Sequence, residues 1–228
     1  MGDHVAIKAR LAGFLYVLLV AAGFFAEYFV RGQLMTASAV ETAQRIRAGE
    51  ELFRLGFGAE VVGGGFYVAV VTLLYEVLRP AGRSLSLHAA VFGLIGCAVF
   101  IVNLINKLAV IVLIANGQSD DLIFVFLKLH VRGYQLAMVF FGCYLLFAGW
   151  VMLRARFLPR FLGTLWFVGG FGYVAFYLLN FVAEDAVGDL RRYFTTVGNI
   201  GEIVLALWLL VFGVNAEKWR AQANAEGS

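Results

Sequence analysis

Charge and proline are both scarce in this chain of 228 residues. Charged residues make up 14% of it and hydrophobic residues 62%, whereas a soluble domain carries about 25% charge. One globular core cannot bury so much apolar surface, so lipid must be the solvent for much of it. The stretches outside the apolar runs are also too short to bury a core of their own, which excludes a soluble domain.

Groups that carry out covalent or metal chemistry are also few. Cys97 and Cys143 lie inside apolar runs, which excludes a disulfide framework and is typical of small packing residues. His88 and His130 fall near opposite faces of the membrane, so they cannot share a haem, and no convergent set of zinc ligands occurs. We therefore predict no metal and no cofactor.

Nucleic-acid binding has no support, because the basic residues are short flanks of the apolar runs.

Six apolar segments are long enough to cross a bilayer, which needs roughly 20 residues. They lie at about 9–29, 53–78, 85–116, 122–153, 161–183 and 195–214. We predict a single all-α domain, a bundle of six transmembrane helices. The third and fourth segments exceed the hydrocarbon thickness, so they must tilt, protrude or break, and we expect a break in the fourth near Lys128–Gly133.

The positions of lysine and arginine predict the orientation of the bundle. At one set of helix ends, basic residues such as Arg79, Arg83 and Arg154 have few acidic neighbours. At the other set, acidic residues accompany the basic ones. We therefore expect both termini in the cytoplasm.

Polar and ionisable side chains recur inside the predicted spans, where they are costly and usually face the bundle interior or a wet cavity. A rise of about 1.5 Å per residue places them in the outer half of the membrane. The predicted ligand-binding set is Glu60, Asn103, Asn106, Lys107, His130, Arg132, Gln135, Asn180, Asn199 and Glu202.

The charged members of this set suggest how a pocket is organised. Lys107 needs a counter-charge, and Glu27, Glu60 and Glu202 are the candidates at similar height. We expect Glu60, Lys107 and Glu202 to form the charged centre of an outward-facing pocket, with His130 and Arg132 near its mouth. Its ligand would be a small polar or amphipathic molecule, such as a lipid headgroup.

Two other functions stay open. The chain could be a membrane enzyme that acts on a lipid or quinone at the outer face, with His130 as the catalytic acid or base. It could also be a structural or accessory subunit of a membrane complex, in which the polar residues serve only helix packing. The sequence leaves the oligomeric state and any partner protein undetermined.

Short motifs spread along the chain carry a family resemblance. They are Ala9–Gly13, Leu52–Phe57, Asn103–Asn106, Leu129–His130 with Gly133–Tyr134, Phe140–Gly142, Arg156–Arg160 with Leu162–Gly163, Gly172–Tyr173, and Gly201–Glu202 with Leu207–Leu210. With these motifs the chain resembles the bacterial membrane proteins grouped as domain of unknown function 4386. The resemblance implies a six-helix protein of the bacterial inner membrane and supplies no activity. Lys107 departs from the pattern, in which we expect an apolar residue after Asn106.

Overall fold

The computed structural model describes residues 2–183 and 191–226, and in these ranges the chain is helical with no strand. The elements are α1 (Gly2–Phe24), the π-helix η1 (Phe25–Arg31), α2 (Gly32–Leu34), α3 (Ala39–Ala48), α4 (Glu50–Leu78), the 3-10 turn η2 (Arg79–Ala81), α5 (Arg83–Asn103), α6 (Ile105–Ala115), α7 (Asp120–Arg154), α8 (Arg160–Val182), α10 (Arg191–Val211) and α11 (Ala216–Glu226). Six stretches of the described chain are long and apolar enough to cross a membrane, which confirms the predicted number of spans.

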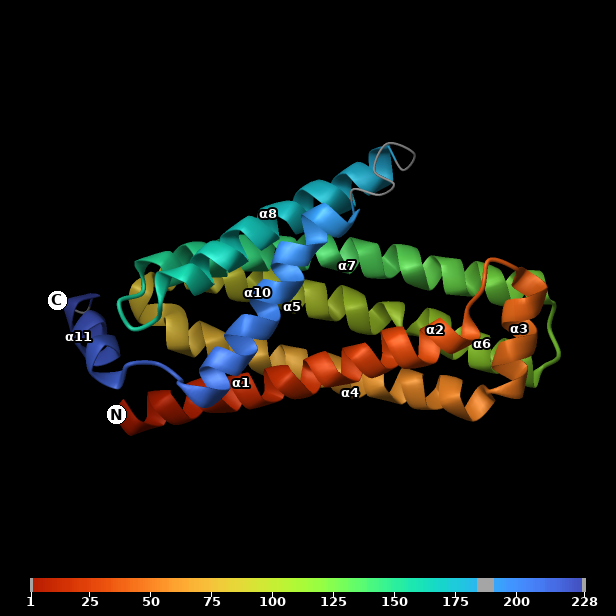
Figure 1. Cartoon of the computed structure of the whole chain (residues 1–228), viewed down its shortest axis with the longest axis horizontal. Coiled ribbons are helices and arrows are strands. Elements are labelled where there is room, and N and C mark those ends of the chain that lie inside the picture. Colours follow the sequence, from red (N-terminus) through yellow and green to blue (C-terminus); the bar gives the residue numbers. More distant parts are fainter. Residues whose placement is uncertain (1, 184–190, 227–228) are drawn as a thin grey trace.

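The six spans form a ring in chain order. Helix α1 contacts α4, which contacts α5, and the ring continues through α7, α8 and α10 back to α1 (Figure 1). Both ends of the chain lie at one end of the bundle, which we call the terminal end, and the short helix α3 lies across the opposite end, which we call the α3 end (Figure 1).

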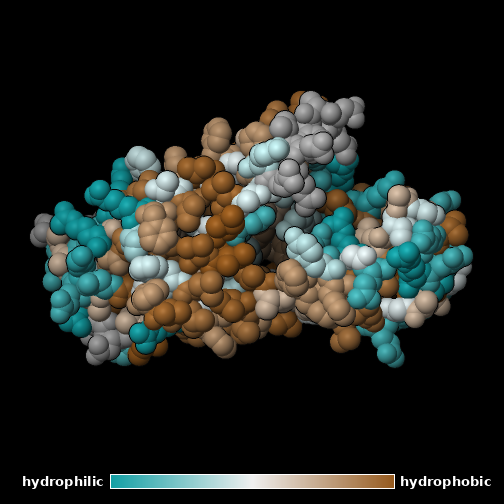
Figure 2. Space-filling view, in the orientation of Figure 1, coloured by the Kyte–Doolittle hydropathy of each residue, from teal (hydrophilic) through white to brown (hydrophobic). Residues whose placement is uncertain are grey.

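The first four spans are longer than a bilayer requires. They contain 31 to 35 residues, which corresponds to about 47–53 Å of helix, against a hydrocarbon core of about 30 Å. Figure 2 shows a hydrophobic belt across the middle of the molecule with hydrophilic residues towards both ends. We conclude that the first four spans project beyond this belt at the α3 end.

The projecting part has a core of its own. It is separate from the main core of the bundle and is covered by α3, whose Ala43 and Ile46 are completely buried. Arg47 of α3 pairs with Asp120 of α7 at 2.7 Å, which fixes α3 across the helix ends. The buried members of this second core are Val30, Leu34, Ala43, Ile46, Phe53, Val110, Ile111, Ile123 and Leu127.

Two of the four long spans are irregular at the level where the two cores meet. The first span passes through the π-helix η1, and the third breaks at Leu104, whose N–H bonds to the carbonyl of Ile101. The break that we predicted in the fourth span is absent, since α7 is continuous. That prediction was wrong because Gly133 serves as a contact surface, on which the Asn103 amide packs where a Cβ would lie, and the Lys128 ammonium lies over the Phe124 ring.

The last two spans pack closely through glycine. A Cβ at Gly169 of α8 would overlap the backbone of Gly198 in α10, so these helices approach each other with no side chain between them. Towards the α3 end, both helices lean away from the four longer spans (Figure 1).

The final helix, α11, makes hydrogen bonds to the ends of α4 and α7 at the terminal end. The Trp219 indole N–H donates to the carbonyl of Val77 at the end of α4, at 2.8 Å. The Gln222 amide accepts from the N–H of Arg156 and donates to the carbonyl of Arg154, so it satisfies the backbone where α7 ends.

Candidate functional site

A buried ion pair lies between the two cores. Lys107 of α6 donates to a carboxylate oxygen of Glu60 in α4 at 2.6 Å, and the two side chains are only 10% and 11% exposed. Taking both charges out of water costs several kcal/mol per ion, which only close pairing offsets. Of the three expected counter-charges for Lys107, the structure therefore selects Glu60.

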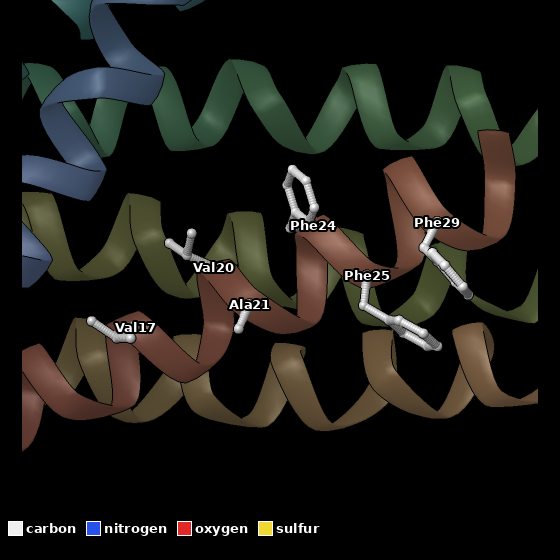
Figure 3. Close-up of a pocket in the computed structure, with 6 residues that line it drawn as sticks. All are labelled: Val17, Val20, Ala21, Phe24, Phe25 and Phe29. Atoms are coloured by element: carbon white, nitrogen blue, oxygen red, sulfur yellow. The ribbon is translucent and has the colours of Figure 1, made fainter.

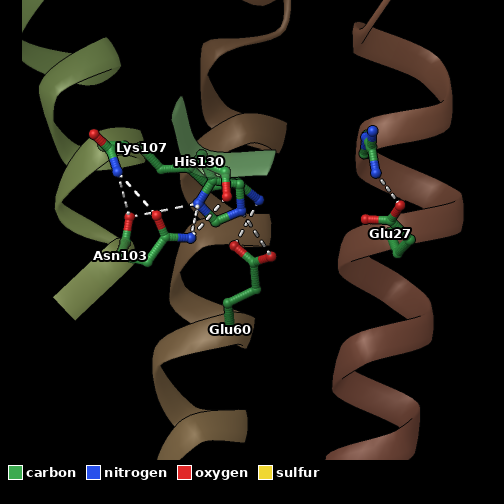
Figure 4. Close-up of polar contacts among 7 residues, drawn as sticks. Glu27, Glu60, Asn103, Lys107 and His130 are labelled. Carbon is green, nitrogen blue, oxygen red and sulfur yellow. Dashed lines mark hydrogen bonds and ion pairs between the residues drawn. The ribbon is translucent and has the colours of Figure 1, made fainter. Parts of the chain in front are cut away.

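An amide network continues from this pair. His130 of α7 has its Nε2 4.0 Å from Glu60, and its Nδ1 faces the Asn103 amide nitrogen at 3.2 Å. The same amide of Asn103 donates to the His130 carbonyl at 2.8 Å, and Asn106 donates to Asn103 Oδ1 at 2.9 Å (Figure 4). Asn103, Lys107 and His130 are each less than 9% exposed, so this network is part of the interior. We call these residues, together with Glu60 and Asn106, the polar layer.

The helix break at Leu104 supports the polar layer. The N–H groups of Lys107 and Leu108 both bond to the carbonyl of Leu104. The carbonyl of Asn103 accepts from the Asn106 side chain instead, at 3.2 Å. The break therefore makes the carbonyl of Asn103 available to a side chain of the polar layer. Non-helical backbone within membrane proteins occurs where such polar partners are present.

The π-helix lies beside the polar layer. Glu27 and Arg31 of η1 form an ion pair, and Figure 4 places Glu27 across from Glu60 on the neighbouring helix. Short π-helical segments occur often at functional sites. Here the segment accompanies the break at Leu104, so the polar layer lies between two irregular helices.

Beyond the polar layer, another group of polar side chains connects α7 to α8. Gln135 of α7 accepts from the Arg132 guanidinium at 3.2 Å and from the Asn180 amide of α8 at 3.1 Å. Asn180 is 9% exposed, so this contact is nearly buried.

A groove of about 430 Å³ opens beside the polar layer. Two asparagines and an arginine enter it, and its remaining walls are apolar apart from one glycine. Leu129, Leu136 and Phe181 are 49%, 46% and 45% exposed, so the groove faces the surroundings of the bundle. The lining residues are Asn103, Asn106, Leu129, Arg132, Gly133, Leu136 and Phe181.

A second groove, of about 520 Å³, follows the first span and has a different character. Figure 3 shows its lining, which is entirely apolar: Val17, Val20, Ala21, Phe24, Phe25 and Phe29. Such a surface fits hydrocarbon but offers no group that could select a ligand by its polar part.

Glu202 and Asn199 are not part of the polar layer. Glu202 of α10 accepts from the hydroxyls of Tyr16 at 2.7 Å and Tyr67 at 3.0 Å, and its Oε2 lies 3.1 Å from the hydroxyl of Tyr173. Tyr173 also donates to Asn199. The structure therefore divides the predicted charged centre into two separate networks.

The two networks lie at different depths. Lys107 follows the start of α5 by 24 residues, or about 36 Å of helix, whereas Glu202 precedes the end of α10 by 9 residues, or about 14 Å. Both distances start at the terminal end, so Glu202 lies nearer to that end than the polar layer does.

The three tyrosines around Glu202 were missed by sequence reasoning, which considered charged and amide side chains only. One signal was available. Tyr67 and Tyr173 stand in similar runs, Gly63–Ala69 and Gly169–Ala175, in which glycines precede a tyrosine within an apolar helix. In the described residues, no group of three or more His, Cys, Asp or Glu side chains could hold a metal ion.

The helix ring, its hydrophobic belt and the buried polar networks define a polytopic α-helical membrane protein. The family model described as "Domain of unknown function (DUF4386)" matches residues 11–213. The chain therefore belongs to this family, as its motifs indicated.

A curated relative extends this result without adding an activity. It is described as an uncharacterized protein of Archaeoglobus fulgidus and is 27% identical over 146 residues, which cover 64% of this chain and 76% of the relative. No solved structure matches the chain.

Proposed function

We propose that this protein binds an amphipathic molecule, with a membrane phospholipid as the best fit, in the groove beside the polar layer. The observation that supports this most directly is the composition of the groove, where Asn103, Asn106 and Arg132 stand among exposed apolar side chains. A free polar metabolite would gain nothing from those apolar walls, whereas a lipid would place its chains there.

The polar side chains fit a phosphate-containing headgroup. A guanidinium donates strong, charge-assisted hydrogen bonds to phosphate oxygens. The Asn106 amide donates to Asn103 through its nitrogen, so its Oδ1 is the group that it offers, as an acceptor for an N–H or O–H of the headgroup. The acyl chains would follow the apolar walls at Leu136 and Phe181.

The buried pair behind the groove would hold these groups in place. Glu60 fixes Lys107, and the amide network from His130 through Asn103 fixes Asn106, which enters the groove. His130 does not line the groove, so we assign it a positioning role and not one in acid–base catalysis. Gln135 would likewise position Arg132, and Asn180 would position Gln135.

We further propose that the terminal end faces the cytoplasm and that the protein resides in the cytoplasmic membrane. The support is the excess of basic residues at that end, the feature that orients membrane proteins. They are Lys8, Arg10, Arg79, Arg83, Arg154, Arg156, Arg160, Lys218 and Arg220. In this orientation the groove takes lipid from the outer leaflet.

The test is lipid retention. Wild type and the variants Asn106→Leu and Arg132→Gln are reconstituted in nanodiscs of a defined mixture of phospholipids and a neutral glycolipid, released gently and weighed by native mass spectrometry. We expect wild type to retain one phospholipid, and each variant to retain roughly tenfold less, since one lost charge-assisted bond is worth about 1.5 kcal/mol or more.

A matched control separates a groove effect from a general loss of charge. Arg54 lies near the α3 end on α4 and pairs with Glu50 on the surface, so Arg54→Gln should retain as much lipid as wild type. Equal retention by all four proteins, or retention of the neutral glycolipid in place of phospholipid, would show the proposal to be wrong.

A further inference from the structure

The second buried network, around Glu202, does not take part in the proposed lipid site. Three phenol hydroxyls, from α1, α4 and α8, surround its carboxyl group, and two of these tyrosines, Tyr16 and Tyr173, are no more than 1% exposed. The cation at Lys107 is engaged with Glu60 in the polar layer. Glu202 is thus a carboxyl group deep in the bundle whose described partners are hydroxyls.

The hydroxyl of Tyr173 decides how the protons are arranged. It lies 2.5 Å from Asn199 Oδ1 and 3.1 Å from Glu202 Oε2, and it has one proton for two acceptors. When the proton points to Asn199, at the shorter contact, the Tyr173 oxygen can accept from Glu202, and that bond requires a proton on Oε2. When the proton points to Glu202, the carboxyl group is the acceptor.

A cage of hydroxyls differs from an ion pair in one useful respect. A lysine or arginine partner would hold a carboxylate in its ionised form only, because neither side chain can accept a hydrogen bond. A hydroxyl both donates and accepts, so the same cage suits either form of Glu202. The exchange needs rotation of a hydroxyl and no movement of a helix.

The other groups that face this cage are neutral or weakly acidic. Tyr144 of α7 and Cys97 of α5 interact electrostatically with the network. The Trp166 indole of α8 packs edge-on against Tyr16 and Tyr144, and its N–H donates to the carbonyl of Gly201 beside Glu202. The surroundings of the carboxyl group are therefore aromatic, and the described groups that face it contribute no cation.

We propose that Glu202 is a proton-binding site in the interior of the bundle. In the protonated form, Glu202 Oε2–H donates to Tyr173, which donates to Asn199. On deprotonation the Oε2–H bond breaks and the proton leaves to water, while the Tyr173 hydroxyl turns from Asn199 to the carboxylate. Tyr16 and Tyr67 donate to Oε1 in both forms.

Infrared difference spectroscopy tests this directly. The protein in lipid is titrated, and the stretching band of protonated carboxyl groups is followed against pH. We expect a band in wild type that disappears as pH rises, shifts when the water is exchanged for D₂O, and is absent from Glu202→Gln. Tyr173→Phe should keep the band and move its frequency, because the acceptor of the Glu202 proton is gone.

Glu60→Gln is the matched control, since it removes the carboxyl group of the separate polar layer. It should leave the Glu202 band unchanged. If the Asn199 nitrogen faced Tyr173 instead, the Tyr173 proton would point to an ionised Glu202, and Glu202 would give no band of a protonated carboxyl group. A spectrum with no band sensitive to Glu202→Gln at any pH at which the protein is folded would therefore overturn the proposal. This outcome is independent of lipid retention at the groove.

Discussion

The Glu60–Lys107 pair should stabilise the protein only as a pair. Glu60→Leu leaves a buried ammonium without its carboxylate, and Lys107→Met leaves a carboxylate without its ammonium. Breaking a buried pair in this way costs about 3–5 kcal/mol, whereas replacing both charges by apolar side chains is often neutral or stabilising. We therefore expect each single variant to lose about 3–5 kcal/mol of unfolding free energy, and the double variant to lie within about 1 kcal/mol of wild type.

The assay is reversible unfolding in mixed micelles with increasing dodecyl sulfate, followed by circular dichroism, on the four proteins of a double-mutant cycle. The expected coupling free energy is about 5 kcal/mol or more, because the losses of both single variants nearly vanish in the double variant. The surface pair Arg54–Glu50, whose side chains are 51% and 35% exposed, is the matched cycle and should give no more than about 0.5 kcal/mol.

Losses in the Glu60 and Lys107 variants that simply add would show that the two charges do not stabilise each other. Single variants that both unfold like wild type would show that the pair is well hydrated in spite of its low exposure.

Three further predictions concern the rest of the fold. Gly133→Ala should lower the unfolding free energy by about 1–3 kcal/mol through overpacking, and the same change at Gly23, where nothing lies within 4 Å, should not lower it. Trp219→Phe removes one donor at the terminal end and should cost about 0.5–1.5 kcal/mol in the same unfolding assay. In a cysteine-free background, a cysteine at Ala48 should react with an impermeant maleimide on intact cells and a cysteine at Ala221 should not, and the reverse result would refute the proposed orientation.

The six spans were predictable because hydrophobic length alone identifies a membrane helix. Their ends were not. The first span continues through η1 to Leu34, and the second begins at Glu50, because these turns project towards the α3 end and contribute apolar side chains to the second core. Hydropathy cannot distinguish the last turns of a membrane helix from a helix that projects into water and packs against α3.

Helix irregularities were predicted in the wrong place for a related reason. Glycine and charge in Lys128–Gly133 indicated a break, yet the break lies at Leu104 in the third span, between Asn103 and Asn106. Whether a glycine interrupts a helix or receives a neighbour depends on the facing helix, and a single sequence does not show which helices face each other.

The sequence predicted the height of the polar residues along their helices in part, but it did not predict which residues pair with each other. Counting residues placed Glu60 and Lys107 at similar height, and the structure pairs them. It placed His130 nearer the mouth of the pocket, whereas His130 lies beside this pair, 4.0 Å from Glu60. The same counting grouped Glu202 with them, although it points into a cage of tyrosines lower in the bundle. A rise per residue gives height along an axis, whereas pairing also depends on helix rotation and tilt, which packing decides.

The central claim, that the groove beside the polar layer binds a phospholipid, is tested most directly by crosslinking. A photo-reactive side chain is placed at Leu136 inside the groove or at Val62 of α4, which are 46% and 53% exposed, and the attached lipids are identified after illumination in native membranes. We predict that the Leu136 probe captures one phospholipid class in excess over its share of the membrane and that Arg132→Gln removes this excess, while the Val62 probe captures lipids in their bulk proportions. The same lipid profile from both probes, unchanged by Arg132→Gln, would contradict the account.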